Sequence, residues 1–569
     1  MAQAAPAAVI ILAAGAGTRM VSRTPKVLHR IGGRSLLGHA IHAAQGLDPQ
    51  RIAVVVRHER DAVAQHAIEI NPDILIADQD NVPGTGRAVQ CGLSTLDAAV
   101  KARAVALSGA PLDAEGIVST TQVCGPVVVI AGDVPLLDAA TLGELVAAHK
   151  ADGNAVTILT TEVADPTGYG RIVRDPATGS VAAIVEEKDA TDGQRLIREI
   201  NSSVYVFDAE LLRDALTLVT PHNAQGEFYL TDVVAIAHGR GLPVRAVQSD
   251  DPVIVEGVND REQLAVLGAE LNRRILADWM RRGVTVVDPA TTWVDVDVEL
   301  AQDVTLLPGV QLHGASTVGV GATIGPDTTL TDVEIGPDAT VIRTHGSLAV
   351  IGAGATVGPF AYLRPGTELG ERGKIGTFVE VKNGKIGEGT KVPHLSYVGD
   401  ATIGKHTNIG AGTIFVNYDG VNKHHSTVGD GARTGANNIF IAPVSVGDGA
   451  YTAGGTVVRY PVPAGALAVS AGRQRNIDGW VERRRPGTEA ADIARQARES
   501  EAPQESSTLG RQAREEQARA GSASHPVTPA DGTPFGYRIP DAPPTPAFGT
   551  PQAQSPNHNS PNKESGDAQ

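Results

Sequence analysis

Short apolar runs alternate with helical patterns from the N-terminus to about residue 258. The apolar runs are rich in β-branched residues, which is typical of strands buried in a parallel sheet. They occupy residues 7–14, 51–57, 73–77, 125–133 and 154–160. Helical patterns over residues 36–47 and 138–150 lie between them. This alternation predicts an α/β layer fold, Rossmann-like in outline, in which ligands bind at the carboxyl ends of the strands.

A longer helical pattern covers residues 260–282. Its apolar residues recur at helical spacing, namely Leu264, Leu267, Leu271, Ile275 and Trp279. Gly283 follows in the position of a C-terminal cap. We expect residues 259–283 to form a linker helix that follows a first domain of residues 1–258.

From about Val284 to Val458 the pattern changes to a period of six residues. The repeated positions, mostly aliphatic, are Ile351, Val357, Leu363, Leu369, Ile375, Val381, Ile403, Ile409, Phe415, Val428, Thr434, Phe440, Val446 and Thr452. A fixed short period is the mark of a solenoid, and one inward residue on each flat face would fill its interior. The pattern resembles the hexapeptide repeat, which implies a left-handed parallel β-helix over residues 284–485. That fold is an exception to the usual right-handed crossover.

Residues 486–569 are rich in Pro, Ser, Gln, Ala and Glu. Such a composition cannot bury enough apolar surface to offset the entropy of ordering. We therefore expect a disordered tail.

Composition and charge narrow the class of protein. The chain has 569 residues, 42% hydrophobic and 20% charged, which fits a globular protein of more than one domain. Its net charge of -16 disfavours nucleic acid as a partner, because phosphate backbones select basic surfaces. Two cysteines give no disulfide framework and favour the reducing cytoplasm. No long apolar run predicts a membrane span, and the apolar N-terminus lacks the basic leader of a signal peptide.

The segment LAAGAGTRM, residues 12–20, places a glycine turn between the first strand and Arg19. Backbone amides in such a turn can receive phosphate oxygens, and Arg19 and Lys26 add positive charge. The alternative is a plain strand-to-helix turn with solvated cations. Position 20 is Met, so the segment does not match the G-x-G-x-x-G dinucleotide fingerprint.

This segment followed by Pro25-Lys26 resembles the signature of sugar nucleotidylyltransferases. The resemblance implies that a sugar 1-phosphate attacks the α-phosphate of a nucleotide and releases pyrophosphate. The attacking phosphate monoester, with a second pKa of about 6, is already an anion at neutral pH, so no general base is required. Cations and Mg²⁺ must instead offset the repulsion between the two anions.

Oxygen ligands for Mg²⁺ are predicted at two positions. Asp133 ends the apolar run at 125–133, and Asn259 lies in GVNDR at the end of the first region. Such a pair suits Mg²⁺, which keeps several waters and takes few protein ligands. The alternative for Asp133 is an aspartate that merely opens a loop.

Nine segments in order resemble the uridylyltransferase half of the bifunctional bacterial GlmU family. They are LAAGAGTRM, PKVLH, PGTGRAV, GDVPLL, GYGRI, IVEEKDA, EINSSVYVF, GEFYLTD and GVNDR. The resemblance implies that the nucleotide, UTP, is bound by Leu12, Ala13, Ala14, Gly15, Lys26, Gln79, Gly84 and Thr85, the last three at the uracil edge. It implies that the sugar is bound by Gly170, Glu186, Asn201 and Asn259. It further assigns Mg²⁺ to Asp133 and Asn259, phosphate contact and catalysis to Lys26, and transition-state stabilisation to Arg19.

Polar residues interrupt the repeat region and suggest a second chemistry. Transfer of an acetyl group to an amine requires a neutral amine, so His394 is a candidate base; the alternative is an exposed histidine on a coil corner. Arg364 and Lys382 suit a sugar phosphate, with solvated surface charge as the alternative. For Tyr397, Asn417 and Tyr418 the choice is between ligand contact and packing against a neighbouring coil.

The segments RPGT, VEVKN, HLSYVGDA and NIGAGTIFVNYDG resemble the acetyltransferase half of the same family. The resemblance makes His394 the base. It places Arg364, Lys382, Tyr397 and Asn408 on glucosamine 1-phosphate, the acetyl acceptor, and Asn417, Tyr418, Ala436 and Gly454 on acetyl-CoA. It also implies a homotrimer that assembles through the β-helix, and a product, UDP-N-acetylglucosamine, that supplies cell-wall synthesis.

Several positions depart from the family pattern. Ala436 stands where serine is usual, Gly454 where alanine is common, and Arg87 where histidine is usual. Residues 97–125 resemble an insertion.

Two rival functions remain open from the sequence. In one, the chain performs only nucleotidyl transfer and the β-helix is an assembly or regulatory module. In the other, the chain is a nucleotide sensor that binds UTP without releasing pyrophosphate.

Overall fold

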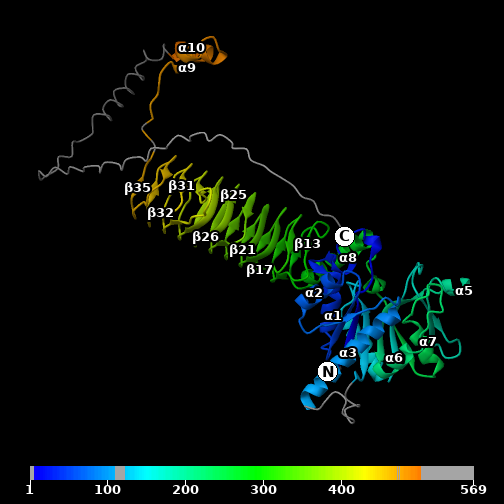
Figure 1. The fold of residues 1–569 in the computed structure, drawn as a ribbon. Coiled ribbons are helices and arrows are strands. Elements are labelled where there is room, and N and C mark those ends of the chain that lie inside the picture. Colours follow the sequence, from blue (N-terminus) through cyan, green and yellow to red (C-terminus); the bar gives the residue numbers. More distant parts are fainter. Residues whose placement is uncertain (1–4, 109–121, 471, 473, 502–569) are drawn as a thin grey trace, which may run out of the picture. The chain divides into compact units, whose positions relative to one another are not determined.

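The structure is a computed structural model that describes residues 5–108, 122–470, 472 and 474–501. Figure 1 shows the first region as a sheet covered by helices and the second region as strands stacked side by side. The central sheet has the strand order β11-β7-β10-β6-β1-β4-β5. These strands are β1 (Ala8–Leu12), β4 (Ile52–Val56), β5 (Leu75–Asp78), β6 (Pro126–Ala131), β7 (Val156–Glu162), β10 (Glu199–Asp208) and β11 (Val244–Ser249). Short strands β8 (Arg171–Arg174) and β9 (Val181–Val185) extend it beside β10.

Both faces of this sheet are buried, which explains why its strands read as continuous apolar runs. In β1, Ile10 packs into one core cluster, whereas Val9 and Ile11 pack into the other. The first cluster is covered by α3 (Thr85–Ser108), α6 (Ala209–Leu216) and α7 (Asp232–Gly239). The second is covered by α1 (Leu36–Gln45), α2 (Arg60–Ile70) and α4 (Ala139–Ala151). The five predicted strands and two predicted helices are confirmed within a few residues.

The sheet is mixed, because it also contains strand β10, which the sequence analysis did not predict. Strand β10 runs antiparallel to both β6 and β7 and lies between them. Its register shifts between Asn201 and Tyr205, where Ser203 has a φ of 61°. The polar sequence EINSS at its start hides the strand from a search for apolar runs.

Helix α8 (Arg261–Arg281) contacts two separate cores. Its Leu267 packs with Met20 and Ile31 of the first region, and its Leu276 and Trp279 join the core of the strand region. Gly283 follows with a φ of +94°, the left-handed conformation that ends helices. The helix occupies the span that the sequence predicted.

The strand region is built from parallel pairs in two long sheets. The first contains β12 (Thr285–Val286), β15 (Thr305–Leu306), β18 (Thr323–Ile324), β20 (Thr340–Val341), β22 (Thr356–Val357), β25 (Lys374–Thr377) and β27 (Lys391–His394). The second runs from β13 (Trp293–Val294) to β34 (Val457–Val458). It includes β21 (Thr344–Ile351), β23 (Ala361–Leu363), β26 (Glu380–Ile386), β28 (Tyr397–Ile403), β29 (Ile414–Val416) and β31 (Ile439–Ile441). Many parallel strands in this arrangement are consistent with the predicted left-handed β-helix.

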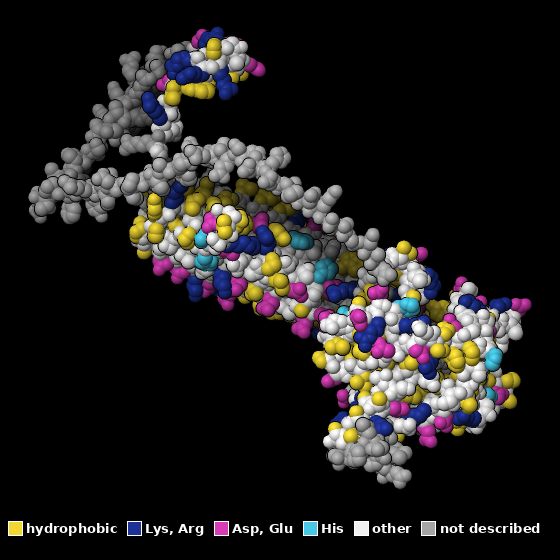
Figure 2. Space-filling view, in the orientation of Figure 1, with side chains coloured by type: hydrophobic (Ala, Val, Ile, Leu, Met, Phe, Trp, Pro, Cys, Tyr) yellow, Lys and Arg dark blue, Asp and Glu magenta, His cyan; other side chains and the backbone are white. Residues whose placement is uncertain are grey.

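All the predicted inward positions are buried, with Thr434 the most exposed at 7%. The period is interrupted where a coil is one residue shorter, as from Val381 to Ile386. Ile386, Val392 and Val398 are also buried and fill the positions that a strict period of six misses. Figure 2 shows Asp and Glu side chains along one edge of the strand region and Lys and Arg side chains gathered above them.

The last part of the chain forms a separate unit from Arg473 onward. It contains α9 (Trp480–Arg484) and α10 (Glu489–Glu501). The expectation of disorder from residue 486 was therefore wrong for α10, whose sequence EAADIARQARESE is rich in good helix formers. The remaining tail, residues 502–569, and residues 109–121 of the proposed insertion lie outside the described residues. Among the helices described, none has the length and apolar character needed to cross a membrane.

Candidate functional site

A cavity of about 290 Å³ opens at the carboxyl ends of β1 and β6. Leu12 and Ala131 pair across these strands, and the amide of Gly132 donates to the Leu12 carbonyl at 2.8 Å. Among the residues lining the cavity are Arg19, Asp133, Gly168, Tyr169, Asn201, Gly257 and Asn259. Four predicted site residues, distant in the sequence, therefore meet at the edge where ligands bind in open α/β sheets.

Lys26, Asp133 and Asn259 form a polar cluster at this cavity, which Asp133 and Asn259 line. The amide of Val258 donates to the Asp133 carbonyl at 2.9 Å, which brings Asn259 beside the end of β6. The Lys26 ammonium contacts the Asp133 carboxylate and lies 3.4 Å from Asn259 Oδ1. Two oxygens that converge on a cation fit the magnesium ligands expected at these positions.

Gly17 explains part of the glycine turn in a way the sequence did not predict. Its φ is +59°, and a Cβ at this position would lie 2.5 Å from Lys26 Cβ. Gly15 has open space instead, since a Cβ there would meet no atom within 4 Å. Gly17 therefore lets Lys26 approach, while Gly15 leaves the turn accessible to a ligand.

The remaining predicted nucleotide residues of the turn lie at the same edge. The Ala13 amide donates to the Val55 carbonyl at 2.9 Å, which continues the pairing with β4 beyond the end of β1. Ala14 follows directly, and Arg19, in a short 3-10 helix (Thr18–Met20), is exposed to solvent beside the cavity. A guanidinium in this place is available to an anionic ligand.

The three residues predicted at the uracil edge are Gln79 and Gly84, in the loop between β5 and α3, and Thr85, the first residue of α3. Gln79 Nε2 donates to the carbonyls of Val82 and Gly84, at 3.1 and 3.4 Å. Thr85 Oγ1 accepts from the Leu230 amide at 3.1 Å. Gly84 has a φ of +119°, and a Cβ on it would lie 2.3 Å from the Phe228 carbonyl oxygen. Gly84 thus allows two backbones to touch.

Substitution Gly84→Ala should destabilise the first region by about 2–3 kcal/mol. The added methyl group would clash with the Phe228 backbone, and the φ of this position disfavours any residue with a side chain. Thermal unfolding followed by circular dichroism measures the loss. Gly179→Ala is the matched control, since Gly179 also has a positive φ but a Cβ added there would meet no atom within 4 Å. Equal losses in the two variants would show that the contact with Phe228 is unimportant.

Gly170, Glu186 and Asn201, predicted to hold the sugar, lie close together. A Cβ on Gly170 would be 3.4 Å from both Asn201 Cβ and Glu186 Oε2. Asn201 donates from Nδ2 to the Tyr205 hydroxyl at 2.8 Å, and Glu186 Oε1 accepts from Thr231 Oγ1 at 3.3 Å. These contacts hold a carboxylate and an amide that can pair with sugar hydroxyls.

Burial raises the pKa of Glu186, and Asp189 and Asp232 add to the rise. A raised pKa means that the ionised side chain is less stable in the fold than in the unfolded chain. The protonated side chain of Glu186 therefore contributes stability below the ordinary glutamate pKa. This contribution is lost as pH rises through the pKa of Glu186 in the folded protein. We expect Glu186→Gln to raise the unfolding midpoint at pH 7, with the gain disappearing toward about pH 4.

The neighbouring residue provides a control of opposite sign. Hydrogen bonds from Arg171 lower the pKa of Glu187, so Glu187→Gln should lower the midpoint at pH 7. If both variants shift the unfolding midpoint in the same direction, burial is not the cause of the raised pKa of Glu186.

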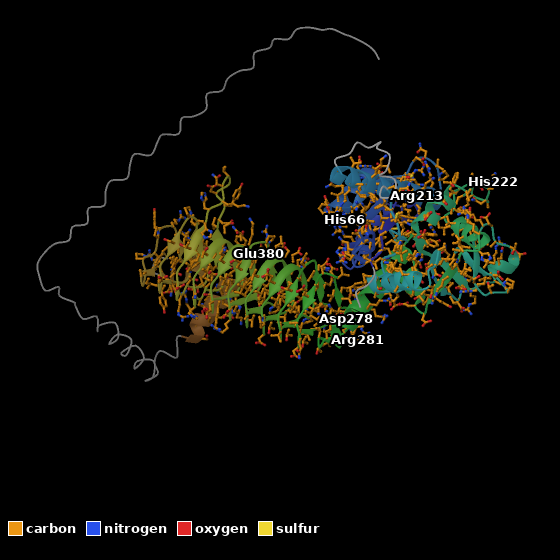
Figure 3. The ribbon with its side chains drawn as sticks, turned by 90° about the horizontal axis from the view of Figure 1, so that it is seen from below. His66, Arg213, His222, Asp278, Arg281 and Glu380 are labelled. Atoms are coloured by element: carbon orange, nitrogen blue, oxygen red, sulfur yellow. The ribbon has the colours of Figure 1, made fainter. Side chains whose placement is uncertain are left out.

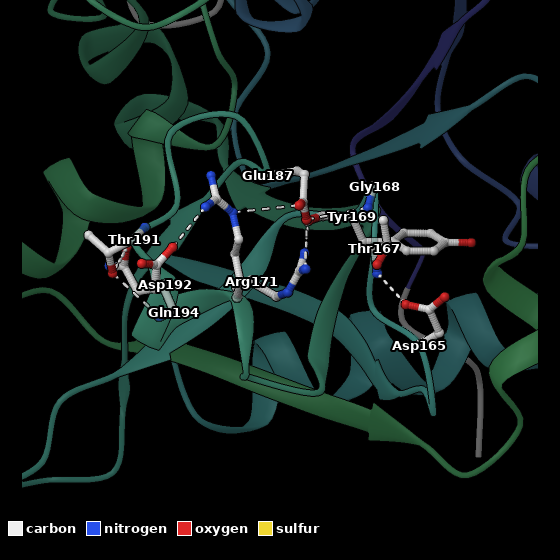
Figure 4. A network of polar contacts seen from close by, with 10 residues as sticks. Asp165, Thr167, Gly168, Tyr169, Arg171, Glu187, Thr191, Asp192 and Gln194 are labelled. Atoms are coloured by element: carbon white, nitrogen blue, oxygen red, sulfur yellow. Dashed lines mark hydrogen bonds and ion pairs between the residues drawn. The ribbon is translucent and has the colours of Figure 1, made fainter.

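Arg171 supports residues that line the cavity, and the sequence analysis did not predict this contact. Its side chain is only 1% exposed, and its Nη2 donates to Glu187 Oε2 at 2.6 Å. It also donates to the Tyr169 carbonyl, while Glu187 accepts from the Gly168 amide at 3.3 Å (Figure 4). The Arg171–Glu187 pair thus fixes the backbone of residues 168–169, which line the cavity. The GYGRI and IVEEKDA segments signalled both residues, but only the structure shows them paired.

A second polar cluster lies on β23, β26 and β28 of the strand region. Arg364 Nη1 donates to Glu380 Oε1 at 2.9 Å, and Glu380 pairs with Tyr397 in the strand register. Figure 3 shows Glu380 among the side chains of this region. Lys423 lies beside Lys382 and lowers its pKa. Like charges brought together in this way indicate a site for an anion.

Asp400 fixes the side-chain amides of two asparagines near these cations. It accepts from Asn383 Nδ2 at 2.7 Å and from Asn417 Nδ2 at 2.5 Å. Burial alone would raise the pKa of Asp400, but the two hydrogen bonds and the charges of Lys382 and Lys423 together outweigh burial, and the pKa is lowered. Asn417 Nδ2 also lies 3.5 Å from the Tyr397 hydroxyl. Asp400, like Lys423 and Glu380, was not among the predicted site residues.

His394, Ala436 and Gly454 occupy equivalent corners of the coils, and Ala411 lies on the coil between the first two. The His394 carbonyl accepts from the Gly412 amide at 3.2 Å, and the Ala411 carbonyl accepts from the Asn437 amide at 2.7 Å. The Ala436 carbonyl accepts from the Gly455 amide at 2.8 Å, which continues the row toward Gly454. All three predicted residues are exposed. They form one accessible row along the corner, which we call the corner row.

Two predicted residues lie elsewhere. Asn408 bridges Lys391 and Arg433, so it lies on the face of the first long sheet, away from Lys382 on the second. Tyr418 is in a projecting turn in which it pairs with Lys423, and its hydroxyl donates to the Gly420 carbonyl at 2.6 Å. A single chain therefore does not bring Asn408 to the Arg364–Lys382 cluster.

Comparison with known proteins adds independent information. Residues 9–204 match the MobA-like NTP transferase domain family. The chain is 57% identical to the protein named Bifunctional protein GlmU of Pseudarthrobacter chlorophenolicus, over 86% of this chain and 96% of that protein. It is also 57% identical to the proteins of the same name from Kineococcus radiotolerans and Mycolicibacterium gilvum. Those matches cover 87% and 86% of this chain, and 96% and 94% of the two proteins. Identity of this extent across both the sheet region and the strand region places the chain in the GlmU family of bifunctional proteins.

Proposed function

We propose that the chain makes UDP-N-acetylglucosamine in two steps at two separate centres. The strand region transfers acetyl from acetyl-CoA to glucosamine 1-phosphate, and the sheet region then joins N-acetylglucosamine 1-phosphate to the uridylyl group of UTP and releases pyrophosphate. The observation that carries this proposal is the presence, on one chain of the GlmU family, of two separate clusters of cationic and polar side chains. These are Lys26–Asp133–Asn259 at the strand ends and Arg364–Lys382–Lys423 on the coils.

In uridylyl transfer, the residues at the strand ends bind and neutralise two anions. Lys26 and Arg19 supply fixed positive charge to the phosphates, which favours the charge that develops on the leaving pyrophosphate. The open turn at Gly15 admits the phosphates, and Gln79 meets the uracil. Glu186 and Asn201 receive the sugar hydroxyls.

Asp133 and Asn259 would hold the Mg²⁺ ion that the family implies. An ion held there would supply positive charge that offsets the charge of the phosphates. The contact of both oxygens with the Lys26 ammonium supports this assignment, because a position that attracts one cation also suits another.

In acetyl transfer, His394 takes the proton of the amino group so that the nitrogen lone pair can attack the thioester carbonyl. The new amide bond forms as the carbon–sulfur bond breaks, and the second proton of the nitrogen passes to the leaving sulfur, so that CoA departs as its thiol. Arg364 and Lys382 hold the phosphate of glucosamine 1-phosphate beside Tyr397. The corner row from His394 to Gly454 suits the extended acetyl-CoA chain, and Asn417 and Tyr418 are the further contacts that the family implies.

The position of Asn408 supports assembly as a trimer. Because Asn408 lies on a different face from Lys382, a site that contains both would need residues of neighbouring β-helices. We assign residues 1–258 to uridylyl transfer, 259–283 to the linker helix and 284–485 to acetyl transfer. Cytoplasmic location and supply of cell-wall precursors belong to the same proposal.

A coupled assay tests the proposed function. Purified protein is mixed with glucosamine 1-phosphate, acetyl-CoA, UTP and Mg²⁺, and free thiol and pyrophosphate are followed separately. Thiol should appear first, and pyrophosphate should follow after a lag. If pyrophosphate forms from added N-acetylglucosamine 1-phosphate but no thiol is ever released, the chain is a nucleotidyltransferase only. UTP binding without pyrophosphate release would identify a sensor.

A further inference from the structure

Arg87 holds a loop of the nucleotide site through a chain of contacts that begins at Asp80. Arg87 lies in the first turn of α3, and Asp80 lies just beyond β5. The guanidinium makes a two-point pair with the carboxylate, with Nε 3.1 Å and Nη2 2.5 Å from Asp80 Oδ2. Its Nη1 donates to Gln90 Oε1 at 2.6 Å, so the guanidinium is held on both sides. Such pairs fix geometry as well as charge.

Asp80 in turn shapes the loop around Gln79. Its Oδ1 accepts from the Val82 amide at 3.0 Å, which forms a tight turn. The Val82 carbonyl, together with that of Gly84, accepts from Gln79 Nε2. The order of contacts therefore runs from Arg87 to Asp80, then to Val82, and then to the amide of Gln79.

These contacts determine which end of the Gln79 amide faces a base. Both carbonyls are acceptors, so the NH₂ end must point toward them. The carbonyl end, Oε1, is left as an acceptor. Uracil presents an N3–H donor, whereas cytosine presents an N3 acceptor at the same place. An amide fixed with its oxygen outward therefore pairs with uracil and opposes cytosine.

The far end of the loop is held in another way. The Phe228 amide donates to the Pro83 carbonyl at 3.1 Å, and the Gly86 amide donates to the Phe228 carbonyl at 2.8 Å. The Gly84 end of the loop is thus tied to a neighbouring backbone, whereas the Asp80 end is tied by the Arg87 side chain. Loss of Arg87 would free the Val82 carbonyl while leaving the Gly84 end in place.

We propose that Arg87 is a positioning residue that fixes the Gln79 amide through Asp80 and Val82, and thereby sets the preference for uracil over cytosine nucleotides. This inference rests on the proposed uridylyl transfer. Arg87 and Asp80 are 32% and 43% exposed, and pairs this exposed contribute little to overall stability. The effect of Arg87 should therefore appear in nucleotide selection and not in folding.

The test is pyrophosphate release from UTP and from CTP, with N-acetylglucosamine 1-phosphate as acceptor. Arg87→Ala should lower the ratio of kcat/KM for UTP over CTP by about tenfold, the order expected for one oriented hydrogen bond. The KM for UTP should rise while kcat changes little, because Arg87 touches no reacting atom. Arg87→Lys keeps the positive charge but loses the guanidinium that makes the two-point pair. Its ratio of kcat/KM values should lie between those of Arg87→Ala and the unsubstituted protein.

Two controls separate this role from a merely structural one. Arg273→Ala removes a similar two-point pair, with Glu270 on α8, and should leave the UTP to CTP ratio unchanged. The double variant Asp80→Asn/Arg87→Ala should be no worse than Arg87→Ala, because both residues act through one contact. The ratio of two substrates is independent of the fraction of folded enzyme.

The inference is overturned if Arg87→Ala keeps the UTP to CTP ratio within twofold of that of Arg273→Ala. Failure of the proposed function gives a different result, since the unsubstituted protein would then release no pyrophosphate from UTP.

Discussion

Replacement of His394 by alanine is expected to slow acetyl transfer to glucosamine 1-phosphate by about 10²–10⁴-fold, the range typical of a lost general base. An ammonium nitrogen has no lone pair to attack a thioester, and imidazole accepts protons near neutral pH. His394 is exposed at the head of the corner row, and Ser396 Oγ donates to its carbonyl at 2.7 Å, so its backbone is fixed. Uridylyl transfer should be unchanged.

Free thiol release measures the acetyl transfer, and pyrophosphate release from N-acetylglucosamine 1-phosphate measures the other reaction in the same sample. His406→Ala is a matched control, because His406 is another exposed histidine at a coil corner. A His394→Ala protein that retains thiol release near the level of His406→Ala would remove His394 from the mechanism.

The second large effect is expected for Asp133→Asn, which should slow uridylyl transfer by about 10²–10³-fold. A loss of this size is typical when an enzyme loses one fixed polar contact to the charge that develops in the transition state. The substitution keeps the size of the side chain but removes the charge that holds Lys26 and favours a cation. Acetyl transfer should continue at its normal rate, since Asp133 belongs to the sheet region.

Pyrophosphate release again provides the measurement, with Asp192→Asn on α5 (Asp192–Arg195) as the control, because Asp192 is a fully exposed aspartate. Binding of Mn²⁺, followed by electron paramagnetic resonance, gives a second readout and should weaken in Asp133→Asn. Unchanged metal binding together with normal uridylyl transfer would remove Asp133 from the proposed magnesium site.

Much of the fold was predictable because its signals are local. Strands such as β1 and β6 read as apolar runs, since Ile10 and its neighbours alternate between two buried faces. The solenoid was predictable because one inward residue recurs at a fixed interval. Strand β10 was not predictable in this way, because its antiparallel position between β6 and β7 depends on pairing with distant segments.

The sequence named candidate site residues one by one, but it could not predict the contacts between them. Sequence resemblance named Lys26, Asp133 and Asn259, whereas only the fold shows that the Lys26 ammonium lies between the two oxygens. Likewise, the role of Gly17 in admitting Lys26 depends on a contact across the turn. Long-range pairs such as Arg171 with Glu187 carry no periodic signal, so no pattern along the chain could indicate them.

The central claim is that one chain carries two independent centres connected by a diffusing intermediate. The most direct test mixes the His394→Ala and Asp133→Asn proteins in equal amounts with glucosamine 1-phosphate, acetyl-CoA, UTP and Mg²⁺, and measures UDP-N-acetylglucosamine. Each variant alone should make almost none, whereas the mixture should make it after a lag in which N-acetylglucosamine 1-phosphate accumulates. A mixture as inactive as its two components would contradict the assignment of the two reactions to separate centres.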